Sequence, residues 1–189
     1  MITPIVNDNK IVFGPCRLSY THVFGKYSMN GDEGKYMTNV LIPKSEKETI
    51  EAVKKAVDNA RKNGITSKWK GKEPKKIDLP LRDGDEKERD DSGVYGGHYY
   101  LNAKANTRPG IVDRRKIPIT DEEEIYSGVW AILSVTFYAY DVNGNKGIAC
   151  GLNNIMKFKD DEHLGGRASA GSDFRSLNFD DAEDNDDDL

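Results

Sequence analysis

Apolar and other side chains alternate without a break over residues 129–140, and this period of two predicts a long β-strand. One face is apolar throughout and is expected to face the core; it carries Val129, Ala131, Leu133, Val135, Phe137 and Ala139. The other face mixes aromatic and hydroxyl groups; it carries Trp130, Ile132, Ser134, Thr136, Tyr138 and Tyr140. That mixture is unusual on a surface that meets water, so the second face is a candidate binding surface.

A tight turn and a return strand follow this strand. Residues 141–145 read Asp-Val-Asn-Gly-Asn, and the Asn-Gly pair supplies the positive φ angles of a two-residue hairpin. The return strand would turn Ile148, Cys150 and Leu152 inward. Its outer face is nearly bare, because it carries Gly147, Ala149, Gly151 and Asn153. An aromatic strand beside a strand of small residues predicts a shallow groove, where we expect a ligand to bind.

Three more strands are expected. The first spans residues 11–18 and is interrupted by Gly14-Pro15, which marks an edge or a bulge. The others cover residues 36–42 and 95–106.

One helix is expected, at residues 46–63. Ser45 and Glu48 have the spacing of a capping box, and four apolar residues then recur at helical spacing. Gly64 is expected to end the helix.

These elements predict a mainly β fold, a small closed antiparallel β-barrel with one helix inserted between the second and third strands. An open two-layer sandwich is the main alternative, since the order of strands in a sheet is not written in the sequence.

The distribution of charge divides the chain. The net charge is −4, yet residues 1–179 hold 28 basic and 25 acidic side chains. The last ten residues are strongly acidic; their acids are Asp180, Asp181, Glu183, Asp184, Asp186, Asp187 and Asp188. A run of like charges repels itself and buries no apolar surface, so we expect a disordered acidic tail at 180–189. A folded domain is predicted at 1–158 and a flexible linker at 159–179.

Composition excludes several classes of protein. No apolar run has the length of a signal peptide or a membrane span. Cys16 and Cys150 form neither a zinc spacing nor a disulfide framework, so buried thiols in a reducing cytoplasm are expected. No phosphate-binding loop or dinucleotide fingerprint occurs, and we expect no cofactor and no metal.

Cations and aromatic rings recur together in three separate segments. Single-stranded nucleic acid offers phosphates to cations and unstacked bases to flat rings, so such a combination favours its binding. The candidate residues are Lys68, Trp69, Lys70, Lys72, Tyr100, Lys104, Arg108, Arg114, Arg115, Trp130, Tyr138 and Tyr140. Each of these residues, taken alone, could have a purely structural role, either in a solvated loop or as a packed ring. The acidic tail resembles a row of phosphates and could compete for the same surface, although a solubility tail is equally compatible with its composition.

Two other functions are compatible with parts of the sequence. Asp83 and Asp85 could hold magnesium in a nuclease, but the segment lacks the spacing of a calcium loop and contains neutralising bases. A virion or protein-interaction module that ignores DNA is the second alternative. We expect no enzyme.

Several motifs resemble those of a family of small bacteriophage single-stranded DNA-binding proteins. They are Leu-Arg-Asp-Gly-Asp at 81–85, Tyr-Gly-Gly-His-Tyr at 95–99, Arg108-Pro109, Phe-Tyr-Ala-Tyr-Asp at 137–141, Gly-Asn-Lys-Gly-Ile-Ala at 144–149 and Gly-Leu-Asn at 151–153. The resemblance extends over about residues 17–164 and, in character, to the acidic tail. Related phage proteins end that tail in an aromatic residue, whereas this chain ends in Leu189.

The resemblance implies an OB-fold barrel that binds single-stranded DNA with little regard to sequence. It also implies a role in phage DNA replication, recombination or repair in the cytoplasm of the host cell. The tail would then contact replication or recombination proteins of the phage or host, and the protein could act as an oligomer.

Overall fold

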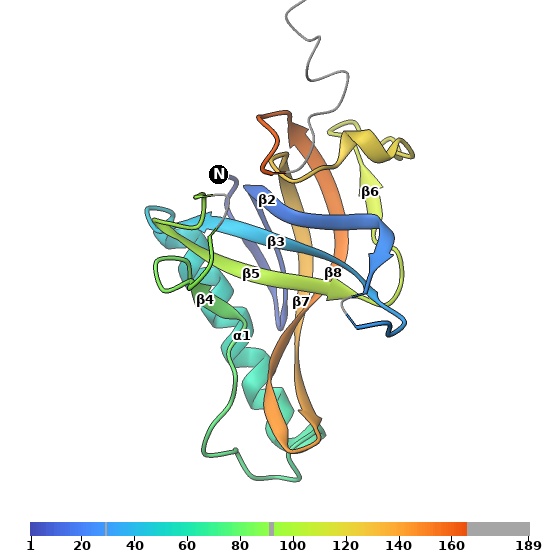
Figure 1. Ribbon diagram of the computed structural model, residues 1–189. Helices are drawn as coiled ribbons and strands as arrows, with labels where there is room; N and C mark the ends of the chain where they lie inside the picture. Colours follow the sequence, from blue (N-terminus) through green and yellow to red (C-terminus); the bar gives the residue numbers. More distant parts are fainter. Residues whose placement is uncertain (29, 91–92, 166–189) are drawn as a thin grey trace, which may run out of the picture.

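The computed structural model describes residues 1–28, 30–90 and 93–165, which form a β-barrel with an arm at one end (Figure 1). The elements in chain order are β1 (Ile5–Asn7), β2 (Lys10–Tyr27), β3 (Lys35–Pro43), α1 (Lys47–Ser67), β4 (Leu81–Asp83), β5 (His98–Ala105), β6 (Gly110–Val112), the 3₁₀ turn η1 (Glu122–Glu124), β7 (Trp130–Val142) and β8 (Asn145–Lys159). The acidic tail and most of the predicted linker lie outside the described residues.

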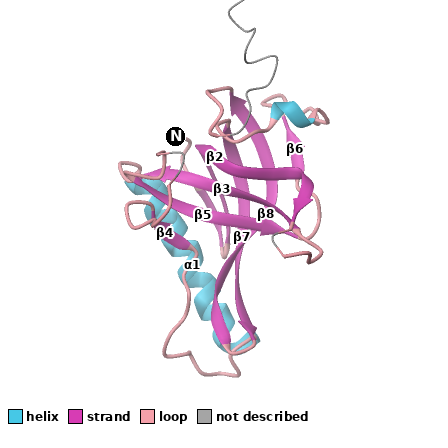
Figure 2. Ribbon diagram, in the orientation of Figure 1, coloured by secondary structure: helices cyan, strands magenta, loops and turns pink. Residues whose placement is uncertain are grey.

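Five strands close the barrel (Figure 2). Neighbours in the order β5, β3, β2, β7, β8 pair antiparallel. A short parallel pairing of β5 with β8, at Ala103–Cys150 and Lys104–Gly151, then completes the circle. The predicted mainly β barrel with one inserted helix is therefore confirmed, and closure excludes the open sandwich.

The core lies inside this barrel and follows the sequence pattern. Ala131, Leu133, Val135 and Phe137 of β7 are wholly buried. On β8 the inward residues are Ile148, Cys150 and Leu152, as expected. The first predicted strand is longer than expected, because the chain passes through Gly14-Pro15 with a shift of register and continues as one strand, β2.

The β7–β8 hairpin extends beyond the barrel as an arm, residues 138–149. β2 pairs with β7 only up to Thr136, and β5 reaches β8 only at Cys150 and Gly151, so no other described strand of the barrel pairs with the arm. Its tip is the predicted Asn-Gly turn, with φ of 51° at Asn143 and 81° at Gly144. α1 packs along β7, and Figure 1 shows the arm and the end of α1 side by side.

The helix differs from its prediction at both ends. Its N-cap is Glu46, and no side chain caps it, so the predicted capping box is wrong. The reason is a backbone turn after Pro43, in which the amides of Glu46 and Lys47 bond to Pro43 and Ser45 and start the helix one residue late. Gly64 does not end the helix. It is buried within α1, where a Cβ would lie 2.4 Å from the Cβ of Ala139 on the arm.

The chain after β8 stays bound to the barrel. Arg17 donates to the carbonyl of Glu162 at 2.9 Å, and the Leu164 amide donates to the carbonyl of Ser127 at 2.8 Å. The packed part of the chain thus continues past the boundary predicted at residue 158. Within the described residues, no helix is long and apolar enough to cross a membrane.

Candidate nucleic-acid interface

A groove of about 220 Å³ lies on the outer face of the barrel, where β5 and β8 meet the base of the arm. Its polar lining consists of three cations, one carboxylate, two phenol rings and an amide: Lys35, Arg82, Lys104, Asp78, Tyr138, Tyr140 and Asn102. Closed sites for small molecules usually measure about 300–1,000 Å³. A smaller, open groove suits a segment of an extended ligand better.

Glycines of β8 make room for the two rings. A Cβ on Gly151 would lie 3.3 Å from the ring of Tyr138, and a Cβ on Gly147 would lie 2.9 Å from that of Tyr140. Each ring therefore lies against a strand with no side chain beneath it. The groove is found where the alternating pattern of the sequence predicts it.

A short segment, residues 77–80, forms one rim of the groove. The Asp78 amide donates to the carbonyl of Lys146, and the Ile148 amide donates to that of Asp78, both at 2.9 Å. The Tyr140 hydroxyl donates to Asp78 Oδ2 at 3.3 Å, and burial followed by the charge of Asp78 raises the pKa of Tyr140. Tyr140 is thus a fixed wall of the groove, whereas the Tyr138 side chain is 47% exposed and presents its ring to solvent.

The groove carries an excess of positive charge. In the described part of the chain, Lys35, Arg82 and Lys104 have no carboxylate within ion-pair distance. The carboxylate of Asp78 also lines the groove, and Asp32 interacts at longer range with Lys35 and Lys104. Some cations elsewhere are paired, as Arg61 is with Asp58 and Glu73. An excess of charge of one sign in a cleft concentrates ligands of the opposite sign, so the groove is suited to an anion.

Trp69 is not available to a ligand. It is 3% exposed, packs against Gly64, and donates its indole N–H to the carbonyl of Tyr140 at 3.2 Å. The prediction that its ring stacks on bases is therefore wrong. The apolar ring is buried because the arm folds down over the end of α1.

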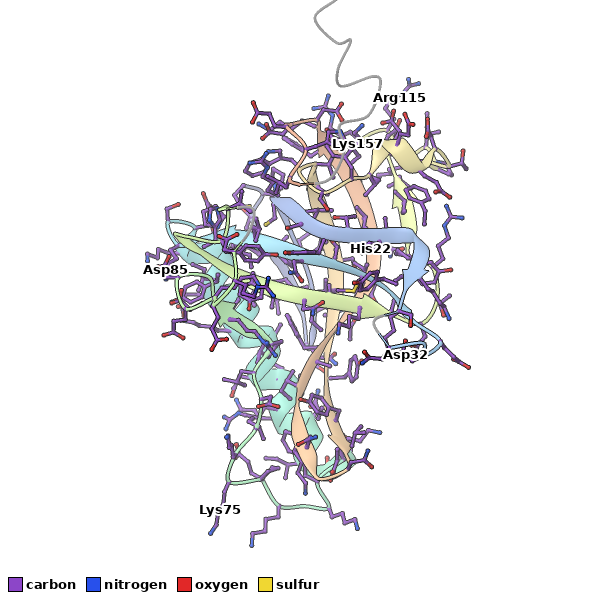
Figure 3. All side chains as sticks on the ribbon, viewed as in Figure 1. His22, Asp32, Lys75, Asp85, Arg115 and Lys157 are labelled. Carbon is purple, nitrogen blue, oxygen red and sulfur yellow. The ribbon has the colours of Figure 1, made fainter. Side chains whose placement is uncertain are left out.

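The other residues of the predicted lysine loop are exposed. None of Lys68, Lys70 and Lys72 lines the groove. Figure 3 shows Lys75 of the same loop at the end of the molecule, and the loop leads into the rim at Asp78.

Figure 3 shows Arg115 and Lys157 at the end of the barrel away from the arm. Trp130 and Arg114 lie at this end as well, because Trp130 pairs with Lys159 and Arg114 contacts the ring of Phe158. Trp130 is eight positions before Tyr138 on the same strand, which is about 26 Å. Its indole donates to Asp161 Oδ2 at 2.6 Å. The neighbouring η1 consists of three glutamates, which repel phosphates. Because of the distance along β7, the structure does not bring these three residues to the groove.

Two further predicted residues flank the groove without lining it. Tyr100 packs edge-on against the buried Tyr95 at 5.0 Å, and its face is approached by Lys87 at 5.5 Å. Arg108 lies 4.8 Å from the centre of the Phe24 ring, beside the β2–β3 hairpin.

The proposed magnesium ligands already hold a cation. Lys44 Nζ lies 2.5 Å from Asp83 and 2.7 Å from Asp85. Hydrogen bonds to Asp83 and then Asp85 raise the pKa of Lys44, and the same bonds lower the pKa of both carboxyls. A charged lysine thus fills the position that a metal would need, and residues 1–28, 30–90 and 93–165 contain no group of three or more potential metal ligands.

The cysteines are buried, as expected. Burial raises the pKa of the Cys16 thiol to about 12 and raises that of Cys150 as well. Neither thiol is therefore a nucleophile near neutral pH.

Sequence reasoning found Lys104, Tyr138 and Tyr140 but missed Lys35, Arg82, Asn102 and the rim segment that carries Asp78. Lys35 directly precedes the strand predicted at 36–42, and Arg82 lies in a segment predicted as a charged turn, so neither stands out locally. Asn102 shares the outward phase of Tyr100 and Lys104, and this phase is the signal that could have identified it.

A five-stranded barrel that carries cations and exposed rings on its outer face defines an OB-fold of the oligonucleotide-binding type. The comparison with known families identifies one family within this class of OB-fold proteins. The chain belongs to the family of the single-stranded DNA-binding protein of Enterobacter phage Enc34, whose family model matches residues 9–189.

Individual relatives agree with this assignment. Protein p50 of Acyrthosiphon pisum secondary endosymbiont phage 1 is 35% identical and covers 90% of this chain and 95% of its own length. The single-stranded DNA-binding protein of bacteriophage Enc34, solved in complex with single-stranded DNA, is 25% identical over 86% of this chain and 94% of its own, with a TM-score of 0.75. Bacteriophage T7 gp2.5, a single-stranded DNA-binding protein, shares the fold at 12% identity, with a TM-score of 0.58 over 85% of this chain and 97% of its own.

Proposed function

We propose that this protein binds single-stranded DNA in the groove, with little dependence on base sequence. The observation that carries the proposal is the exposed ring of Tyr138 surrounded by Lys35, Arg82 and Lys104, which lack carboxylate partners in the described part of the chain. The solved Enc34 complex and the family assignment support it.

Each group in the groove has a distinct task in this mechanism. The cations bind phosphates, which is independent of sequence. Tyr138 stacks on a base, and every base offers a π-face. The Asn102 Oδ1 atom is buried and has no hydrogen-bond partner in the described structure, so it can accept a hydrogen bond from a base amino or imino group.

Replacing Tyr138 by alanine tests the stacking. Loss of one base–ring contact of about 1–3 kcal/mol is expected to weaken binding of a fluorescent oligothymidine about 5- to 150-fold. Tyr138→Phe keeps the ring and is expected to bind as the natural protein does. Val142→Ala, at another exposed position of β7, is the matched control. Unchanged affinity of Tyr138→Ala would refute the role of this groove.

We also propose the biological setting that the resemblance implies, phage DNA replication, recombination or repair in the host cytoplasm. The family assignment supports this setting. The seven acids of residues 180–189 would act as a tethered competitor for the groove, at an effective concentration on the order of millimolar, and would contact partner proteins when DNA displaces them.

Deleting residues 180–189 is expected to tighten binding of the oligonucleotide severalfold at low salt, because a competing polyanion is removed. A variant with the same length, in which the seven acids are replaced by Asn and Gln, separates charge from chain length. Equal or weaker affinity of both variants would leave the tail without a competing role.

A further inference from the structure

The β2–β3 hairpin carries a pair of stacked rings that the groove does not include. His22 and Tyr27 lie with their ring centroids 4.5 Å apart and their planes 23° apart. Tyr27 is 43% exposed, so one of its ring faces is open to solvent. We call this pair the hairpin stack.

The register of the strands places the hairpin stack on the same face as the groove. His22 pairs with Met37, Met37 with Lys104, and Lys104 with Gly151, on which the Tyr138 ring lies. Residues directly opposite one another in a sheet share a face, and this path from β2 to β8 crosses three strand spacings, about 15 Å. Tyr27 is likewise opposite Lys35, which lines the groove.

The backbone around the stack departs from regular strand geometry. The β2–β3 register shifts on both sides of His22, and Tyr20 has a φ of +47°, which is rare for a bulky side chain. Such irregularities in strands re-aim side chains and occur often beside binding sites. Burial also lowers the pKa of His22, so the ring is neutral near pH 7 and stacks without added charge.

The charges at the hairpin favour a base over a phosphate. Its tip holds Asp32 and Glu33, which repel phosphates, and Figure 3 shows Asp32 and His22 on the same side of the barrel. A neutral, half-exposed ring pair at that point suits the uncharged face of a base.

We propose that the hairpin stack is a second platform for a base of the same DNA strand, which leaves Tyr138, passes Lys104 and Lys35, and reaches Tyr27. This inference rests on the proposed function of the groove. It predicts that a strand must be long enough to span both platforms before Tyr27 contributes to its affinity.

The test compares a short oligothymidine of about four nucleotides with one of about twelve, in fluorescence anisotropy at low salt. Tyr27→Leu is expected to bind the long oligonucleotide about tenfold more weakly and the short one unchanged. Tyr27→Phe and Tyr27→Trp are expected to restore binding of the long one. The control is His163→Ala, which removes a ring from another stacked His–Tyr pair of the described chain, Tyr126 and His163, with centroids 3.9 Å apart.

The outcomes separate this inference from the groove itself. Equal affinity of Tyr27→Leu and the natural protein for the long oligonucleotide overturns the hairpin stack, and so does an equal loss for both lengths. If Tyr138→Ala instead leaves both lengths unaffected, the groove is misplaced, whatever Tyr27 does. A melting temperature of Tyr27→Leu equal to that of the natural protein confirms that the variant is folded.

Discussion

Replacing Lys35, Arg82 and Lys104 together by glutamine is expected to flatten the salt dependence of DNA binding. For single strands, the plot of log affinity against log salt changes by about 0.7 per phosphate contact, so three lost contacts change its slope by about two. Taking 1 M salt as the reference, that change corresponds to about a hundredfold weaker binding at 0.1 M salt. Titrations of a labelled oligonucleotide at several salt concentrations measure both quantities.

The matched control removes the same charge from the opposite end of the barrel. Arg114, Arg115 and Lys116 are exposed there, near the acidic η1, and their replacement by glutamine is expected to leave the slope unchanged. If this control flattens the slope as much as the groove variant does, the DNA responds to net charge alone. The groove would then lose its special role.

The barrel could be predicted because its long strands can be recognised from local patterns of apolar and polar residues. The inward phase of residues 129–139 is determined by six consecutive alternating positions, and burial of these residues agrees with it. The pair of strands that closes the barrel could not be predicted in the same way, because β5 and β8 meet over only two residue pairs, at Ala103 and Lys104. Contacts between segments so far apart leave no periodic signal in either segment.

Only those residues of the groove that lie on regular strands could be predicted from the sequence. Tyr138, Tyr140 and Lys104 lie on regular strands, where the outward phase can be read from the sequence. Lys35 and Arg82 reach the groove only through the pairing of β3 and β4 with β5, which the sequence does not display. A residue at the end of a strand or in a turn therefore gains its role from the neighbours that the fold gives it.

Long-range packing also explains why the sequence predicts the wrong role for Trp69. In the sequence, Trp69 stands among five lysines and has the composition of a DNA-binding loop. In the structure its ring joins α1 to the arm, and its N–H bonds to the carbonyl of Tyr140, a wall of the groove. Trp69 thus supports the position of the groove from behind, while the lysines beside it remain in solvent.

Trp69→Ala is therefore expected to reduce stability first and DNA binding as a consequence. Removing a buried tryptophan side chain costs about 3–5 kcal/mol of unfolding free energy, which lowers the melting temperature by about 10 °C in a chain of this size. Trp69→Phe keeps most of the packing and loses one hydrogen bond of about 1 kcal/mol, so its melting temperature should fall much less. Thermal unfolding followed by circular dichroism measures the order of the variants.

The same variants decide between packing and stacking as the role of this ring. A packing role requires that melting temperature and DNA affinity fall together in Trp69→Ala and recover together in Trp69→Phe. Lys72→Ala, an exposed neighbour in the loop, is the control and is expected to keep the natural melting temperature. If Trp69→Ala melted normally and still bound DNA poorly, the ring would have to contact DNA directly, and the buried position found here could not be the DNA-bound one. Because the indole bonds to the strand that holds Tyr138 and Tyr140, we expect the first result.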